Sequence, residues 1–341
     1  MGRGVGLVVG LFLCLVLTFA VFGLPIGDSL RLLAQGAFAD KFAVSRTVVK
    51  SVPLLVTALG IVVAWRAGMY NVGGEGQFIA GGLAGAWVAK AMAFAPHGAP
   101  APLITFAILV ACAVGGGAYG WLAGLLYTRR GVEVVISTIL LNFVAQQILG
   151  WLVAGPLQER VHQLPETDQL PDAWMLPRID PQTDFHLGIV IALLSAVALY
   201  VYLFRTKAGF ELRLVGANAR AARANRVPAK RVQERAMMLS GALCGLAGGI
   251  EYTAMAGQLG TAFSQNWGFL AIPVALLGGL HPLIVIVSAL YFGALFAGSE
   301  QLARFTPAGS TLVYIIQAVA VLGFVSLNAW QERRQTRQEG A

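Results

Sequence analysis

Long apolar runs separated by short polar breaks dominate the chain. A bilayer core takes about 20 apolar residues per helix, and the chain has ten apolar runs, all but one of which approach or exceed that length. They lie at 5–24, 48–64, 76–95, 102–127, 132–154, 187–204, 236–256, 269–280, 282–299 and 310–329. The pattern predicts an all-α integral membrane protein with about ten transmembrane helices.

The first run and the eighth run need separate interpretation. Residues 5–24 exceed the 7–15-residue core of a signal peptide, so we expect residues 1–47 to comprise a retained span and an amphipathic connector, Asp28 to Arg46. Residues 269–280 are too short to cross a bilayer alone and contain Pro273. Because His281 and Pro282 form the next turn, this run and the following one are expected to make a short or broken hairpin.

Composition agrees with a membrane protein. Of 341 residues, 57% are hydrophobic and 12% are charged, and mean hydropathy is +0.72, whereas soluble domains carry roughly 25% charged residues. The net charge of +8 does not indicate a nucleic-acid partner, because the basic residues gather beside apolar spans. A signal for orientation in the lipid bilayer explains them better.

The distribution of charge predicts the topology. With both termini in the cytoplasm, the inner segments hold 16 of the 24 Lys and Arg residues, and loop 155–186 has six acids against two arginines. The positive-inside rule therefore favours cytoplasmic termini, with residues 331–341 as a cytoplasmic tail and loop 155–186 outside. Residues 48–204 and 236–330 form the two halves of the core. The predicted spans of residues 48–154 begin outside the membrane, and those of residues 236–329 begin inside. The two groups are therefore candidates for inverted repeats.

Three polar residues lie in a glycine-rich stretch, residues 67–85. Asn71, Glu75 and Gln77 are costly in lipid and should face protein or water. The surrounding glycines predict that the backbone turns or breaks before the third span. Two interpretations stay open: a re-entrant element that lines a translocation path, or a cytoplasmic turn in which Glu75 interacts with a helix dipole.

Three further polar residues share one face of the fifth span. Thr138, Asn142 and Gln146 recur at i, i+4 and i+8. Such a row suits a polar translocation path, and hydrogen bonding between helices is the alternative. Glycines four residues apart, at 81 and 85, at 116, 120 and 124, and at 241 and 245, predict close helix packing.

The long polar break of the second half, residues 205–235, carries nine basic and two acidic residues. Its middle, Leu214 to Asn225, predicts one short helix that is entered through Gly216 and Asn218 and stopped by Pro228. A helix of so many small residues cannot bury a large core, so it is expected to present a small surface to another protein. A basic cytoplasmic loop that only fixes topology is the alternative.

Sequence signatures of catalysis are absent. The chain has no G-x-x-x-x-G-K-[ST], no H-E-x-x-H, no G-x-S-x-G and no paired cluster of metal ligands. The three cysteines lie inside apolar runs, where they are expected to pack between helices. We therefore expect no enzyme, no metal site and no cofactor in this chain.

Several stretches together resemble the permease subunits of bacterial ABC importers for nucleosides and simple sugars, within the ribose and branched-chain amino acid permease superfamily. They are AGMYNVGGEGQFIAGGLAGA (67–86), GVEVVISTILLNFVAQQILGWLVAGPL (131–157), RTKAGFELRLVGANARAARANRV (205–227), LSGALCGLAGGIE (239–251) and ALLGGLHPLIVIVSALYFGAL (275–295). The chain departs from the family pattern at Val132, Ala219, Trp267 and Pro273.

The resemblance implies that the middle of the basic stretch is a coupling helix, which docks on a cytoplasmic ATPase. Carried onto this chain, the coupling residues are Gly216, Ala217, Asn218, Ala219, Ala221, Ala222 and Arg223. The resemblance further implies ATP and Mg on a separate ATP-binding subunit, an extracytoplasmic substrate-binding protein, a second identical or homologous permease chain, and the bacterial cytoplasmic membrane. A secondary transporter driven by an ion gradient is the alternative, but no span has the carboxylate relay that it would need.

Overall fold

The computed structural model describes residues 23–93 and 100–305, together with residues 16, 19–21, 315, 318, 319 and 322. This described part is helical, and its only β pairs are two isolated bridges. The helices are α2 Ile26–Phe38, α3 Lys41–Arg66, α4 Gly74–Ala93, α5 Ala101–Arg130, α6 Val134–Val153, η1 Asp172–Trp174, α7 Gly188–Arg205, α8 Lys207–Ala217, α9 Ala219–Ala224, α10 Ala229–Glu251, η2 Tyr252–Ala256, α11 Trp267–Leu277 and α12 Pro282–Arg304.

Five helices of the described part are long and apolar enough to cross a membrane, namely α3, α5, α6, α7 and α12. The predicted spans at 76–95 and 236–256 correspond to α4 and to α10 with η2, whose glycines and charged ends lower their hydropathy. The first span and the last lie almost entirely outside the described residues. The expected all-helical membrane architecture is therefore confirmed, and the number of ten spans stays a prediction.

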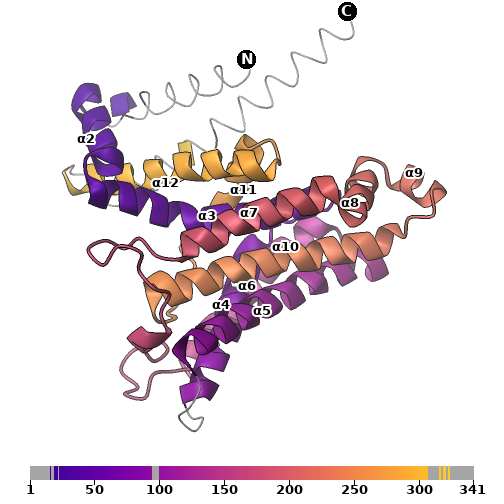
Figure 1. Cartoon of the computed structure of the whole chain (residues 1–341), viewed down its shortest axis with the longest axis horizontal. Coiled ribbons are helices and arrows are strands. Elements are labelled where there is room, and N and C mark those ends of the chain that lie inside the picture. The colour runs from indigo at the N-terminus through magenta and orange to yellow at the C-terminus, as the bar shows by residue number, and fades with distance from the viewer. Residues whose placement is uncertain are drawn as a thin grey trace, which may run out of the picture. The chain divides into compact units, whose positions relative to one another are not determined.

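The chain divides into two compact units, and Val52–Ala289 forms the larger one, here called the central unit. Figure 1 shows α5 and α10 running alongside each other within it. We call the end of this unit where α4, α6 and α10 finish the loop end, because the long 154–187 connection lies there. The opposite end, which carries α8 and α9, is called the basic end.

A seam of glycines joins α4, α5 and α10. A Cβ atom added at Gly116 would lie 2.4 Å from the carbonyl oxygen of Gly241, and one at Gly245 would lie 2.3 Å from that of Cys112. A Cβ at Gly81 would lie 2.4 Å from the Cα of Gly245. Backbone therefore contacts backbone, which only glycine permits, and the predicted packing role of these glycines is confirmed.

The predicted short hairpin is present. Helix α11 has 11 residues with Pro273 inside, and a turn leads directly into α12 at Pro282. Two residues of this turn, Gly279 and Leu280, adopt positive φ values of 59° and 53°. This backbone conformation reverses the chain within a few residues.

The basic stretch differs from the prediction of one helix across Leu214–Asn225. The helix breaks at Asn218, whose backbone is extended (φ −158°, ψ 100°) and whose side-chain oxygen accepts hydrogen bonds from the backbone N–H groups of Arg220 and Ala221. Asn218 is thus the N-cap of α9. Gly216 belongs to the last turn of α8, and Pro228 immediately precedes α10 and does not end α9. The cap competes successfully with the helical propensity of the alanines.

The second unit contains α2, the start of α3 and most of α12. The expected amphipathic connector is α2, which buries Gly36 and Ala37. A Cβ at Gly298 would lie 2.4 Å from the carbonyl oxygen of Leu33, so α2 and α12 also pack closely. Lys50 and Glu300 form an ion pair of 2.6 Å across this unit.

Candidate functional site

Asn71 is the centre of a buried polar cluster in the central unit. Its Nδ2 atom donates to Gln77 Oε1 and to Ser240 Oγ, both at 2.9 Å. Its Oδ1 atom accepts the backbone N–H of Gly73 at 2.8 Å. Asn71 and Ser240 are fully buried, and Gln77 is 1% exposed. The non-helical segment between α3 and α4 is thereby fastened to both α4 and α10.

Two residues of α6 hold the same segment from the other side. Thr138 Oγ1 accepts the backbone N–H of Val72 at 3.3 Å. Asn142 donates to the carbonyl oxygen of Val72 at 3.0 Å and accepts the backbone N–H of Gly76 at 2.8 Å. Both side chains are buried. The close approach needs glycine, since a Cβ at Gly76 would lie 3.0 Å from Asn142 Oδ1.

Glu75 and Gln146 extend the cluster to the segment around α11. Glu75, 5% exposed in the first turn of α4, accepts the backbone N–H of Gly268 at 2.7 Å. Gln146 is only partly buried and donates to the carbonyl oxygen of Thr261 at 2.7 Å. Hydrogen bonds therefore place the six predicted path residues in one region of the central unit, around the start of α4, the adjoining part of α6 and the segment that leads into α11.

This arrangement bears on the two interpretations left open by the sequence. The backbone does break at residues 67–73, and Glu75 does begin a helix. Five of the six side chains are buried and form hydrogen bonds within the subunit, as expected for residues that hold neighbouring helices together. Gln146 is the partly exposed member. Their role as walls of a translocation path stays a prediction.

The predicted coupling segment contacts the same α3–α4 turn. A Cβ added at Gly216 would lie 2.1 Å from the carbonyl oxygen of Arg66, and a Cβ at Gly68 would lie 3.3 Å from the Cα of Gly216. The last turn of α8 therefore rests directly on the backbone that follows α3. Because no side chain lies between the two backbones, a displacement of α8 would move the α3–α4 turn directly.

Arg66 links this contact to the α11–α12 turn. Its Nε atom donates to the carbonyl oxygen of Leu280 at 3.0 Å and its Nη2 atom to that of Gly279 at 3.3 Å. In the sequence, Arg66 is only one of the 16 basic residues of the inner segments. Its carbonyl partners lie 214 and 213 residues away, so no local pattern could have found them.

Aromatic side chains bring α7 into the same linkage. The imidazole of His281 stacks on the ring of Phe204 with ring centroids 5.3 Å apart. The guanidinium carbon of Arg213, in α8, lies over the same Phe204 ring, 4.9 Å from its centroid. Arg213 Nε also donates to the carbonyl oxygen of Leu203 at 3.0 Å. We use the name basic-end linkage for Arg66, Arg213, Gly216, Phe204 and His281.

Helix α9 presents the small surface that the sequence predicts. Ala222 is fully buried, Ala219 and Ala221 are partly buried, and Ala217, Asn218 and Arg223 are exposed. An open hollow of about 790 Å³ adjoins this helix. Its cationic lining residues are Arg129, Arg223, Lys230 and Arg231. The arrangement can receive an acidic or concave partner surface, and none of these groups assembles a nucleophile with a base.

The fold and site define a multi-pass helical membrane protein whose buried polar groups form contacts between helices. Residues 43–322 match the family model described as branched-chain amino acid transport system, permease component, and the chain belongs to this family. It is a transport component and not an enzyme. The resemblance to ABC importer permeases stated from the sequence motifs is confirmed.

Several relatives align over most of this chain. The glucose ABC transporter permease protein of Haloferax volcanii is 32% identical, covering 90% of this chain and 82% of its own length. The guanosine ABC transporter permease protein of Bacillus subtilis is 31% identical, covering 90% and 87%. A nucleoside ABC transporter permease protein of Lactococcus lactis subsp. cremoris is 31% identical, covering 72% and 69%. No solved structure matches the chain.

Proposed function

We propose that this chain is the membrane permease of an ATP-driven importer that moves nucleosides or simple sugars into a bacterial cytoplasm. The observation that carries the proposal is the basic-end linkage, in which α8 contacts the α3–α4 turn and Arg66 of α3 bonds to the α11–α12 turn. The names of the relatives support this solute class, since they specify glucose, guanosine and nucleosides.

The proposed mechanism begins at α9. A separate ATPase subunit, which holds ATP and Mg, receives the α9 surface and moves it when its nucleotide sites close. Gly216 and Arg66 pass that displacement to the segment that Asn71 and Asn142 fasten between α4, α6 and α10. Differential binding of ATP and solute to the outward-open and inward-open states then drives the cycle.

The proposed assembly contains further subunits. An extracytoplasmic binding protein delivers solute to the loop end, and a second permease chain, identical or homologous, completes the path. The basic end faces the cytoplasm together with both chain termini, in accord with the positive-inside rule. Gln146, partly exposed beside Thr261, is the proposed contact with solute among the six polar residues.

The first experiment tests for the ATPase partner. The tagged chain is purified in mild detergent, and the ATPase activity of the co-purifying complex is measured with guanosine or glucose and the binding protein. We expect an ATPase subunit to co-purify and its turnover to rise with solute. If the chain purifies alone and moves solute in liposomes without ATP, it is a secondary transporter and the proposal fails.

A substitution at α9 tests the coupling surface. Ala221→Glu places a larger charged side chain on the partly buried face, so we expect ATP-driven uptake to fall at least tenfold while the protein still folds and inserts in the membrane. Ala154→Glu, at an exposed position of the loop end, is the matched control and should transport normally. Uptake at the wild-type rate by Ala221→Glu would refute the assignment of α9 as the coupling helix.

A further inference from the structure

A hollow with a mostly apolar lining and a few charged side chains lies at the loop end of the central unit, apart from the basic-end linkage. It has a volume of about 320 Å³ and is bounded by the end of α4, the 155–171 part of the long loop and Tyr252. Ala86, Ala89 and Ala93 lie on one face of α4 and form its floor. Because these side chains are single methyl groups, the end of the helix leaves space open that larger residues would fill.

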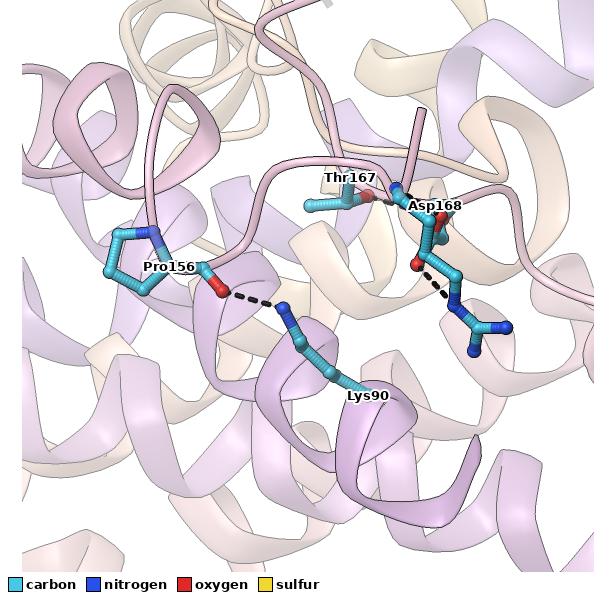
Figure 2. A network of polar contacts seen from close by, with 5 residues as sticks. Lys90, Pro156, Thr167 and Asp168 are labelled. Atoms are coloured by element: carbon cyan, nitrogen blue, oxygen red, sulfur yellow. Dashed lines mark hydrogen bonds and ion pairs between the residues drawn. The ribbon is translucent and has the colours of Figure 1, made fainter. Parts of the chain in front are cut away.

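The walls of this hollow combine two cations, Lys90 and Arg160, with the anion Asp168 and the aromatic rings of Trp174 and Tyr252. Figure 2 shows Lys90 reaching to the carbonyl of Pro156, with Thr167 and Asp168 on the loop nearby. Lys90 Nζ donates to Pro156 O at 2.6 Å, which uses one of its three N–H donors. The carboxylate of Asp168 accepts the backbone N–H of Arg160 at 3.0 Å. Its other oxygen lies 3.4 Å from Nε of Arg160, in an ion pair between two exposed side chains. Acceptor capacity still remains on this carboxylate, because these two contacts occupy only part of its roughly four lone-pair sites.

Backbone hydrogen bonds hold the walls in place without a ligand. Thr167 N–H donates to the carbonyl oxygen of Leu259 at 2.9 Å, and Leu170 N–H donates to that of Gly257 at 2.8 Å. The carbonyl oxygen of Trp174 accepts the hydroxyl of Thr105 at 2.9 Å. The loop is thereby fixed to the end of α10 and to α5, so the hollow is pre-formed, as small-molecule sites generally are.

We propose that this hollow is a solute-binding site for a neutral ring compound with several hydroxyl groups, such as a sugar or the ribose of a nucleoside. Hydroxyl groups both donate and accept, so they match Lys90 and Asp168 together. The partly buried ring of Trp174 provides an apolar face for the ring of the solute.

The proposal rests on the proposed importer function for its choice of ligand. In that function the loop end receives solute from the binding protein, and the hollow is then the first site of the permease that the solute occupies. The site nevertheless belongs to the chain itself, and its occupancy does not require ATP or a partner subunit. Binding and transport can therefore be tested separately.

The test is equilibrium binding of radiolabelled guanosine and radiolabelled glucose to the full chain in lipid nanodiscs. Ala93→Phe fills the floor of the hollow at an exposed position, so we expect at least tenfold weaker binding of the preferred probe. Met92→Phe is the matched control, because Met92 is exposed on the same turn and does not line the hollow. Trp174→Leu should weaken guanosine binding about five- to 150-fold, since stacking on a base contributes about 1–3 kcal/mol.

The outcomes separate the two proposals. If the wild-type chain binds neither probe, or if Ala93→Phe binds as tightly as Met92→Phe, the hollow is not a solute site, even where ATP-driven uptake succeeds. Suppose that Ala93→Phe loses binding, Met92→Phe keeps it, and the assembled complex shows no ATP-driven uptake. The hollow is then a solute site, and the proposed importer function is wrong. A larger effect of Trp174→Leu on guanosine than on glucose identifies a nucleoside as the ligand.

Discussion

At the scale of single residues, Arg66 joins two turns that are far apart in the sequence. Its guanidinium spans the carbonyl oxygens of Gly279 and Leu280, and charge-assisted hydrogen bonds of this kind contribute about 1.5–3 kcal/mol each when they are well shielded. Arg66 is only partly buried, so a smaller contribution is expected. Its importance lies in the connection that it makes between α3 and the α11–α12 turn.

Replacing Arg66 tests this connection. We expect Arg66→Met to lower ATP-driven uptake about tenfold while ATP hydrolysis continues, because the movement of α8 no longer reaches the α11–α12 turn. Arg66→Lys should recover only part of the uptake, since an ammonium cannot span two carbonyl groups as a guanidinium does. The ratio of uptake to ATP hydrolysis is the measurement. Equal loss of both activities would show that Arg66 has only a structural role.

His186, at the loop end, predicts a pH dependence of stability. Burial is the main cause that lowers the pKa of this imidazole to about 4, with the nearby Arg178 acting in the same direction and Asp184 opposing it. Its Nδ1 atom accepts the backbone N–H of Gly188 at 3.1 Å, which requires an unprotonated Nδ1. The neutral form is therefore the one that the folded loop holds.

The sign follows from the two pKa values. Since the folded pKa lies below the ordinary value of 6.5, the unfolded chain binds the proton more readily, and stability falls as pH decreases from about 6.5 to 4. The loss approaches roughly 3 kcal/mol below pH 4. Thermal unfolding of the purified chain between pH 4 and 7 measures it. His186→Gln should reduce this dependence, and an unchanged slope in that variant would contradict the assignment.

At the scale of elements, the glycine seam sets the spacing of α4, α5 and α10. We expect Gly245→Ala to destabilise the protein by about 1–3 kcal/mol, because its Cβ would lie 2.3 Å from the carbonyl oxygen of Cys112. Gly150→Ala in α6 is the control, since no heavy atom lies within 4 Å of the added Cβ. Unfolding in detergent measures both variants. Equal stability of the two would show that the seam has room for a methyl group.

Several elements could be predicted from the sequence because their signals are local. The four-residue spacing of Gly116 and Gly120 indicates a close helix contact, and Pro273 with His281 and Pro282 indicates a short hairpin. The row of Thr138, Asn142 and Gln146 predicts a shared face. In each case the residues that carry the signal lie within one or two helical turns.

Other features could not be predicted because they depend on distant partners or on competing local preferences. The alanines and arginines around Asn218 favour one continuous helix, and only the hydrogen bonds of the Asn218 side chain reveal that it begins a new one. The contact of Gly216 with Arg66 joins residues from different halves of the chain. The sequence also leaves open whether Asn71 faces solute or protein. In the structure its side chain is buried and hydrogen-bonded to Gln77 and Ser240.

At the scale of the whole molecule, membrane orientation can be tested by chemical labelling. Arg220→Cys lies on exposed α9, and Asp172→Cys lies on the exposed part of the long loop. With a membrane-impermeant maleimide applied to intact cells, we expect Asp172→Cys to react and Arg220→Cys to react only after the membrane is opened. Cys112 and Cys244 are buried, and Cys14, which lies outside the described residues, is replaced by serine to limit background labelling. The reverse pattern would invert the topology.

The glycine seam also limits where the molecule can bend. Because the backbones of α4, α5 and α10 touch without side chains between them, a slip of one residue along the seam would push a side chain into a carbonyl group. The three helices must therefore translate and rotate as one rigid block. In the proposed mechanism, a displacement of α9 therefore reaches only the edges of this block, and a compound designed to arrest transport should bind at the turns of Arg66 and Leu280.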